Sequence, residues 1–235
     1  MAEKNGLACF FKNQVAHWAL LLVLLGITWA VRSQMEAGDS AFLGLSARFW
    51  FLLSLGVPIL HQVFVWGVWR AELCYSAVTG TFGTKGFECY AILFSIIGIS
   101  RVLAVLGLGI ADFQSLGLPP ALTVALLVLL TPPAAYLGFS VAKYFGARRA
   151  FGIDHFDAAY RNKPLEKRGI FKYTRNGMYW YGFLIFWVMA IACNSRLALL
   201  LAFFNHAYIW VHYHCTEKPD LRILYGNRRT ASNET

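Results

Sequence analysis

Four long apolar runs constrain this chain more than any other feature. They cover residues 14–31, 49–69, 89–111 and 121–142. A helix of roughly 20 residues is long enough to cross the hydrocarbon core of a bilayer. Charged residues make up only 14% of the chain, against about a quarter in soluble domains. The sequence therefore predicts an all-α, polytopic membrane helical bundle with these runs as its first four spans.

Two shorter apolar runs follow, at residues 178–193 and 197–213, and only residues 194–196 separate them. They predict a tight C-terminal helical hairpin that either spans the bilayer or is partly re-entrant, which gives about six spans in total. We expect the chain to consist of two parts. Residues 1–145 form the four-span membrane bundle. Residues 146–235 form a cofactor site from a cytosolic basic loop, the helical hairpin and the C-terminal tail.

Basic residues set the expected orientation, because Lys and Arg are retained on the cytosolic side of a membrane. Of the 21 Lys and Arg residues, 17 fall on the side shared by the N-terminus, residues 70–88, residues 143–178 and the C-terminal tail. We therefore expect a multi-pass protein with both termini cytosolic, in the endoplasmic reticulum of a eukaryote or the inner membrane of a bacterium. The net charge of +9 comes without any nucleic-acid-binding motif, so it does not indicate DNA or RNA as a partner.

Arg101 lies deep inside the third run. A charge there is unfavourable by at least about 2.5 kcal/mol on insertion scales. Its guanidinium should face the bundle interior or an anionic headgroup. Alternatively, the long side chain extends (snorkels) to the membrane–water interface. We take it as the candidate substrate-binding residue.

Neither disulfides nor metal ligands are indicated. The five cysteines are odd in number and lack C-x-x-C spacing, so we expect free, reduced thiols and no zinc site. Asp154, His155 and Asp157 form one histidine with two carboxylates and no further spaced ligand. We predict hydrogen-bonding or cofactor-contacting roles for them and no metal.

The segment from Gly169 to Tyr181 is where a basic loop becomes an apolar helix. Arg175 and Asn176 are its last strongly polar residues, at an expected helix N-terminus, where unpaired N–H groups and the helix dipole favour an anion. A second polar cluster ends the last apolar run. On a helix, His206, Trp210 and His214 share one face, and the pattern E-x-x-x-L-x-x-x-Y-G follows at Glu217, Leu221, Tyr225 and Gly226.

Together these segments resemble the integral membrane methyltransferases that include isoprenylcysteine carboxyl methyltransferase and the phospholipid N-methyltransferases. That family has a loop L-x-x-x-G-x-(Y/F)-x-x-x-R-H-P-x-Y-x-G, a helical hairpin, and a tail E-E-x-x-L-x-x-x-(F/Y)-G. The resemblance covers residues 160–226. The loop is matched by Leu165, Gly169, Phe171, Arg175 and Tyr179, and the tail by Glu217, Leu221, Tyr225 and Gly226.

The chain departs from the family pattern in three respects. Asn176 and Gly177 replace the His-Pro pair, the glycine after the tyrosine falls one residue late at Gly182, and Lys218 replaces the second glutamate. Asparagine still donates and accepts hydrogen bonds, and glycine can open a helix. A binding role for this pair therefore remains expected.

The resemblance implies S-adenosylmethionine as the methyl donor, bound on the cytosolic side between loop and tail. Arg175 would hold its carboxylate, and Glu217 its ammonium group or ribose hydroxyls. Tyrosines would pack on the adenine or the sulfonium. The predicted cofactor-binding residues are Gly169, Phe171, Tyr173, Arg175, Asn176, Gly177, Tyr179, Glu217, Leu221, Tyr225 and Gly226.

We expect methylation of a membrane lipid, preferably N-methylation of phosphatidylethanolamine or its methylated derivatives, because a lipid can enter such a bundle sideways. An amine must lose a proton before it attacks. Glu217 and His214 are the candidate catalytic residues, with Asp220 as a third candidate base. The alternatives are carboxyl methylation of isoprenylcysteine, an NADPH-dependent membrane sterol reductase, and a non-enzymatic membrane transport or binding protein.

Overall fold

The computed structural model describes residues 6–35, 41–161, 163–164, 166–174 and 176–225. Within them the regular secondary structure is helical except for one two-stranded antiparallel hairpin, in which Ala41 pairs with Ser46 and Phe42 with Leu45. The elements are α1 (Gly6–Phe10), α2 (Gln14–Ser33), β1 (Ala41–Phe42), β2 (Leu45–Ser46), α3 (Ala47–Tyr75), α4 (Ala77–Phe82), α5 (Lys85–Ala111), α6 (Pro120–Ser140), the π-helix η1 (Val141–Phe145), α7 (Ala147–Ala150), the 3-10 helix η2 (Ile153–His155), α8 (Ala158–Arg161), the 3-10 helix η3 (Gly169–Lys172), α9 (Gly177–Gly182), α10 (Leu184–Ala192), α11 (Arg196–His212), the π-helix η4 (Tyr213–Glu217) and α12 (Lys218–Tyr225).

Four helices are long and apolar enough to cross a membrane, and they coincide with the four predicted spans. They run over Gly6–Ser33, Ala47–Tyr75, Lys85–Ala111 and Pro120–Phe145. Large apolar side chains cover their outer surfaces, which is the surface expected against lipid tails. The prediction of an all-α membrane bundle is therefore confirmed.

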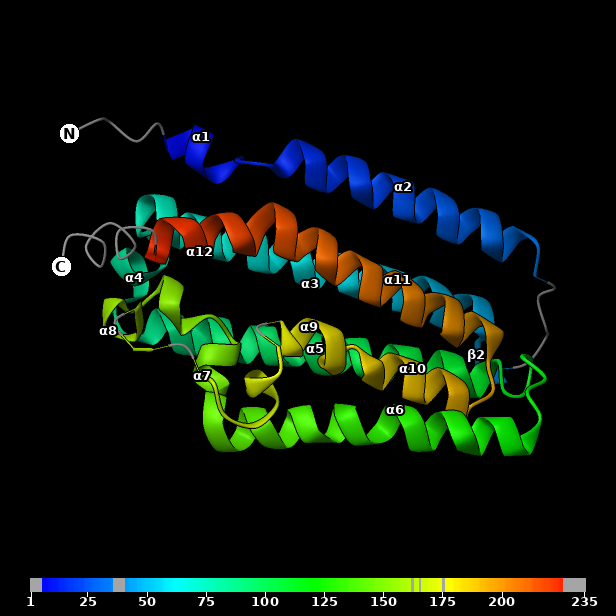
Figure 1. The fold of residues 1–235 in the computed structure, drawn as a ribbon. Coiled ribbons are helices and arrows are strands. Elements are labelled where there is room, and N and C mark those ends of the chain that lie inside the picture. The colour runs from blue at the N-terminus through cyan, green and yellow to red at the C-terminus, as the bar shows by residue number, and fades with distance from the viewer. Residues whose placement is uncertain (1–5, 36–40, 162, 165, 175, 226–235) are drawn as a thin grey trace.

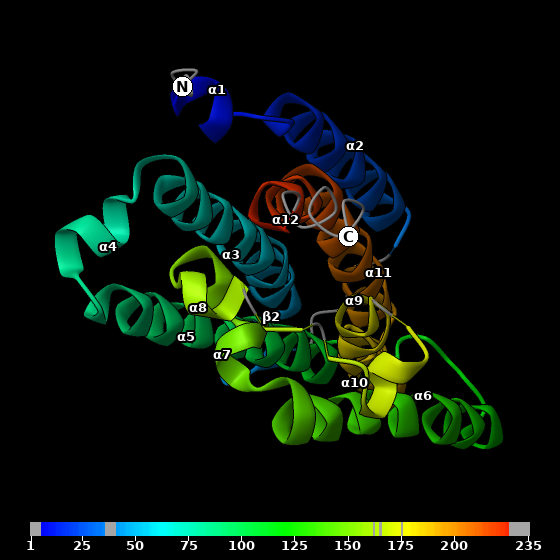
Figure 2. The ribbon, with the colours of Figure 1, turned by 60° about the vertical axis from the view of Figure 1, so that its left-hand side comes forward.

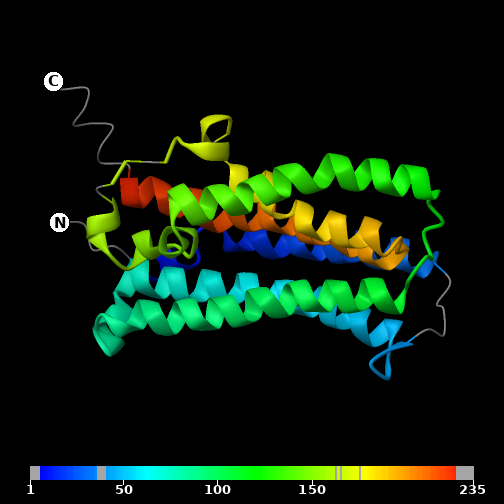
Figure 3. The same cartoon turned by 90° about the horizontal axis from the view of Figure 1, so that it is seen from below.

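Helix α11 is the centre of the bundle. It packs against α2, α3, α5 and α10, and Figure 2 shows it between α2 and α5. Leu201, Phe204 and Tyr208 on α11 have no exposed surface. Helices α3 and α5 lie antiparallel, side by side along most of their length (Figure 3). The two walls of the site described below are α11 and the α3–α5 pair.

The predicted C-terminal hairpin is present, with α9 and α10 as its first arm and α11 as its second. Its turn is anchored by Asp112 at the end of α5. The Asp112 carboxylate accepts hydrogen bonds from the Ser195 hydroxyl at 2.7 Å and from the Leu197 N–H at 2.9 Å. The Ser195 hydroxyl in turn caps α11 by accepting from the Ala198 N–H at 3.0 Å.

Two of the cysteines contradict the expectation of free thiols, because Cys9 and Cys74 form a disulfide across 65 residues of sequence. Helix α1 folds against the end of α3, where the Phe10 ring lies 5.2 Å from that of Trp66. Arg70 also donates a hydrogen bond to the Cys9 carbonyl. This packing brings the two sulfurs together, and no local spacing in the sequence indicates it. The remaining cysteines, Cys89, Cys193 and Cys215, are free.

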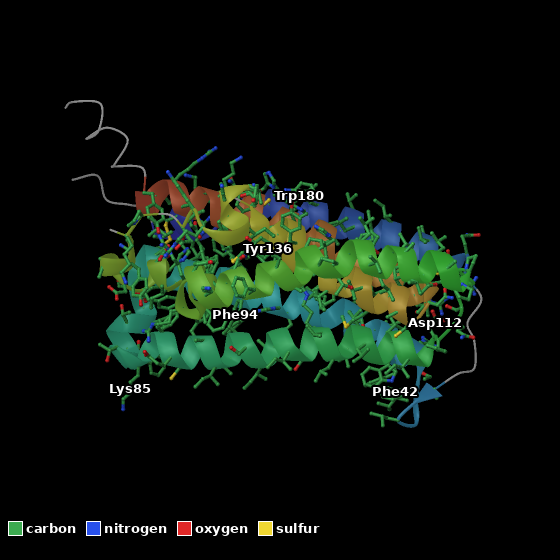
Figure 4. The ribbon with its side chains drawn as sticks, turned by 60° about the horizontal axis from the view of Figure 1, so that its bottom comes forward. Phe42, Lys85, Phe94, Asp112, Tyr136 and Trp180 are labelled. Atoms are coloured by element: carbon green, nitrogen blue, oxygen red, sulfur yellow. A yellow bond between two sulfur atoms is a disulfide. The ribbon has the colours of Figure 1, made fainter. Side chains whose placement is uncertain are left out.

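Helices α1, α4, α8 and α12 gather at one end of the bundle, at the left of Figure 1, and the β-hairpin lies at the other. We call the end that holds α1, α4, α8 and α12 the basic end, because Lys12, Lys85 and the basic residues from Lys143 to Arg161 lie there. Figure 4 places Lys85 at the basic end of α5 and Asp112 at its opposite end, with Phe94 between them.

Candidate functional site

A cavity of roughly 700 Å³ opens near the basic end and extends down between α3, α5 and α11. Its size is that of a site for a cofactor or a drug-sized ligand. Polar groups gather at both its mouth and its floor, with aromatic walls between them. The lining residues used below are His61, Gln62, Trp69, Phe94, Arg101, Arg149, Asp154, Phe171, Asn176, Tyr179, Phe183, His212, Tyr213, Glu217, Leu221 and Tyr225.

Two π-helical turns border this cavity, η1 at the end of α6 and η4 at the end of α11. A π-turn accommodates one extra residue and changes the direction of the side chains that follow; such turns are frequent at functional sites. Phe145 of η1, and Tyr213 and Glu217 of η4, face the cavity. The widened turn after α11 thus brings Glu217 to the site.

Glu217 is the carboxylate in the middle of the site. The Tyr179 hydroxyl, from α9, donates a hydrogen bond to its Oε2. Burial raises the pKa of Glu217 to about 7; the Tyr179 hydrogen bond opposes this, and repulsion from Asp220 and Asp154 adds to it. The group is therefore poised to exchange a proton near neutral pH, as a general base requires.

Asp154 and Tyr225 close the mouth of the cavity. The Tyr225 hydroxyl donates to Asp154 Oδ2, and Arg149 Nε lies 3.9 Å from the same oxygen. Burial, followed by the hydrogen bond with Asp154, raises the pKa of Tyr225 to about 12. Tyr225 therefore stays a neutral donor across the physiological pH range. Arg149 Nη1 also donates to the Pro164 carbonyl at 2.8 Å and so holds the loop to the mouth.

A buried ion pair supports the mouth from behind. Arg70 Nε on α3 lies 2.8 Å from Asp220 Oδ1 on α12, and both side chains are fully buried. His155 Nε2 lies 3.5 Å from the other Asp220 oxygen, and its ring stacks on Trp69 with centroids 4.2 Å apart. Asp220 is thus held between Arg70 and His155 behind the mouth of the cavity.

Gly152 makes the stacking of Trp69 on His155 possible. It has a φ of +80°, and a Cβ there would lie 2.4 Å from the Trp69 ring. Glycine is the one residue that adopts this backbone conformation without strain and also leaves room for the indole. The loop before η2 can therefore lie directly against α3.

The floor of the cavity lies among the spanning helices. Arg101 is 4% exposed and lines the cavity, so it faces the bundle interior, one of the two orientations expected for it. Its Nε donates to the Asn205 side-chain oxygen. His61, Gln62 and His212 line the same cavity. His212 begins the second polar cluster of the sequence, whereas no sequence pattern indicated His61 or Gln62.

The structure brings together seven of the residues predicted from sequence. Phe171, Asn176, Tyr179, Glu217, Leu221, Tyr225 and Arg101 all line the cavity. Gly169 and Gly177 support it without lining it. Gly169 has a φ of +59°, and a Cβ there would lie 2.5 Å from the Ser140 hydroxyl. That hydroxyl accepts a hydrogen bond from the Ile170 N–H at 3.0 Å.

Other predicted residues lie elsewhere. Tyr173 is 74% exposed. His214 is exposed, with its Nδ1 2.9 Å from the Trp210 carbonyl, because the π-turn directs Tyr213 and Glu217 to the cavity instead. Leu165, Arg175 and Gly226 lie outside the described residues. Within the described part of the chain, no three His, Cys, Asp or Glu side chains are placed to hold a metal ion.

The C-terminal part of the chain matches a known family. Residues 121–228 fit the family model of phospholipid methyltransferase, which confirms the resemblance to this methyltransferase superfamily and extends it to α6. No curated protein and no solved structure matches the chain. The family domain and the membrane helices together support a membrane methyltransferase of the phospholipid or isoprenylcysteine type.

Proposed function

We propose that this chain, with its phospholipid methyltransferase domain, is an S-adenosylmethionine-dependent enzyme that N-methylates phosphatidylethanolamine or its methylated derivatives. The observation that carries the proposal is the meeting of the two family segments at one cavity. Phe171, Asn176 and Tyr179 come from the loop and first hairpin arm, and Glu217, Leu221 and Tyr225 from the tail. These segments touch directly through the Tyr179 to Glu217 hydrogen bond.

The chemistry of the cavity fits the proposed donor. S-adenosylmethionine supplies an activated methyl group when bound, and it carries a sulfonium and an ammonium. Glu217 offers a carboxylate flanked by the rings of Tyr179 and Tyr213, whose centroids lie 4.9 Å apart. A carboxylate among aromatic faces favours a cation. Arg175, which lies outside the described residues, remains the residue we propose for the donor carboxylate.

Glu217 is the proposed proton acceptor. The ammonium of phosphatidylethanolamine must become an amine before its nitrogen attacks, and a Glu217 oxygen takes the released proton. A pKa of about 7 suits that role at neutral pH. Its position in the cavity favours it over His214, which is exposed, and over Asp220, which is held by Arg70.

We infer from the distribution of Lys and Arg that the basic end faces the cytosol. The Cys9–Cys74 disulfide lies at that end, and disulfides are rare in the cytosol. A cytosolic basic end thus predicts that this pair is reduced in the cell. Thiol labelling of intact cells or closed vesicles with an impermeant reagent tests the orientation through the exposed Cys89, which reacts only if it faces outward.

The activity is tested with the purified full chain in lipid nanodiscs and methyl-labelled S-adenosylmethionine. We expect label in phosphatidylethanolamine and a roughly 100-fold or greater rate loss in Glu217→Gln. Glu88→Gln is the matched control, since Glu88 is a surface glutamate paired with Arg148. Label in a prenylcysteine peptide alone would transfer the proposal to carboxyl methylation. Absence of donor binding would overturn it and favour a reductase or a transport protein.

A further inference from the structure

The cavity is divided by charge. Its two lining carboxylates, Asp154 and Glu217, are in the mouth and middle. The floor contains Arg101 and, among the described lining residues, no acidic side chain. Arg101 is 16 residues along α5 from Lys85, about 24 Å by helical rise. A charge at such depth marks a functional site by default.

Arg101 has only neutral partners in the described structure. Its Nε and Nη2 donate to the side-chain and backbone oxygens of Asn205, and its guanidinium lies 4.8 Å from the Phe183 ring centroid. None of the described carboxylates forms an ion pair with it. A buried cation without a counter-ion is unfavourable. An oxyanion entering the cavity would supply the missing negative charge.

Two histidines add hydrogen-bond donors to the same cavity. His61 on α3 is 6% exposed and His212 on α11 is 2% exposed. Among the described residues, neither nitrogen of either ring has a hydrogen-bond partner. Each neutral imidazole carries one N–H donor. Helices α3, α5 and α11 thus bring a guanidinium and two imidazoles to one cavity.

We propose that Arg101, His61 and His212 form an oxyanion subsite that holds a phosphate or carboxylate of a ligand bound in the cavity. The inference rests on the proposed function, which brings two such groups to the site: the phosphodiester of the acceptor lipid, and the donor carboxylate, for which Arg101 would then replace Arg175 as the partner. The Cα–Cβ bond of a helical residue tilts toward the helix N-terminus, which for α5 is the basic end. The Arg101 side chain therefore starts toward the cavity mouth, and a ligand entering there reaches its guanidinium.

The experiment compares Arg101→Gln, Arg101→Lys and His61→Phe in the full chain, with Arg48→Gln as the matched control. Arg48 is exposed and does not line this cavity. Donor binding is measured by calorimetry with S-adenosylmethionine and with its decarboxylated analogue. Acceptor use is measured as the KM for phosphatidylethanolamine. We expect Arg101→Gln to raise either the donor Kd or the acceptor KM roughly 10- to 100-fold. The same constant should rise less in Arg101→Lys and His61→Phe, and it should not change in the Arg48→Gln control.

The two arms identify the source of the oxyanion. If it is the donor carboxylate, the wild type prefers the donor over its decarboxylated analogue, and Arg101→Gln loses this preference. If it is the lipid phosphate, the acceptor KM rises while donor binding is unchanged. If folded Arg101→Gln and His61→Phe both keep the wild-type donor Kd and acceptor KM, the proposal of an oxyanion subsite is wrong. Should Arg101→Gln fail to fold, Arg101→Lys and His61→Phe decide. Failure of the wild type itself to bind the donor would remove the proposed function, and the subsite with it.

Discussion

Tyr179 and Glu217 join the two arms of the C-terminal hairpin through a hydrogen bond at the cavity wall. Tyr179 lies one turn into the first arm, and Glu217 ends the π-turn that follows the second. The two residues are 38 positions apart in the sequence. The contact therefore couples the geometry of the hairpin to the ionisation of the one carboxylate in the middle of the site.

Replacing Tyr179 by Phe should weaken donor binding near neutral pH. The Tyr179 hydroxyl lowers the Glu217 pKa, so without it less of the carboxylate is ionised at pH 7. We expect a roughly 3- to 10-fold higher Kd at pH 7 and a return toward the wild-type Kd at pH 8.5, measured by calorimetry. Tyr173→Phe, at an exposed tyrosine, is the control. An unchanged pH profile in Tyr179→Phe would show that the hydrogen bond has no part in binding.

Donor binding to the wild type should tighten as pH rises through about 7, the pKa of Glu217. A cationic ligand prefers the ionised carboxylate, and its fraction rises about eightfold between pH 6 and pH 7.5 for such a pKa. We expect the association constant to follow that rise and to be flat in Glu217→Gln. A variant that keeps the wild-type slope would place the titrating group elsewhere.

Glu217 should also make the empty protein less stable at high pH. Its folded pKa of about 7 lies above the ordinary value of 4.5, so the folded state holds the proton more tightly than the unfolded state. The contribution of Glu217 to stability is then fully present below pH 4.5 and is lost as pH rises through 7, by up to about 3 kcal/mol. Glu217→Gln should melt at a higher temperature than the wild type at pH 8 and at nearly the same temperature at pH 4.5. Equal melting at pH 8 would contradict the raised pKa.

Breaking the buried pair of Arg70 and Asp220 should unfold the mouth of the cavity. Both side chains are fully buried, and removal of one partner leaves the other charge uncompensated, at about 3–5 kcal/mol. We expect Asp220→Asn and Arg70→Met each to lower the melting temperature, and the double variant Arg70→Met with Asp220→Leu to recover most of the loss. If Asp220→Asn instead folds normally and loses only turnover, Asp220 belongs to the chemistry.

Gly152→Ala should destabilise the site more than a comparable change at Gly117. Both glycines have a positive φ, +80° and +70°, but a Cβ at Gly152 meets the Trp69 ring at 2.4 Å, while nothing lies within 4 Å at Gly117. The backbone penalty is of the order of 1 kcal/mol at each position, and overpacking adds about 1–3 kcal/mol at Gly152 alone. Thermal unfolding and the near-ultraviolet signal of the tryptophans measure the difference. Equal effects of the two substitutions would show that the loop yields without strain.

Run length and charge were sufficient to predict the transmembrane bundle, because four long apolar stretches have no other stable environment. The motif spacing also identified six of the residues that line the cavity, since short segments such as Glu217 to Tyr225 are local in sequence. Trp210 and His214 share a face as predicted, with ring centroids 5.8 Å apart, but neither lines the cavity. Which face of a helix borders a cavity depends on tertiary packing, which helical periodicity alone does not show.

Neither the floor of the cavity nor the disulfide could be predicted from sequence motifs, because both bring together residues that are far apart in the chain. His61 and His212 are 151 positions apart in the chain, and only the packing of α3 on α11 brings them to one cavity. Cys9 and Cys74 meet because α1 folds back on the end of α3. Contacts of this kind follow from tertiary packing and leave no periodicity in the sequence.

The first arm of the hairpin is short for a membrane protein. Gly177–Ala192 is too short to count among the full spans, and its 16 residues rise about 24 Å, whereas the hydrocarbon core is about 30 Å thick. With its distal turn at one surface, this arm ends about 6 Å below the other. The bilayer must thin there, or admit the polar residues before α9 into its headgroup layer. Under the proposed function, this mismatch would place the mouth of the cavity level with the lipid headgroups, where a lipid acceptor arrives by lateral diffusion within its own leaflet.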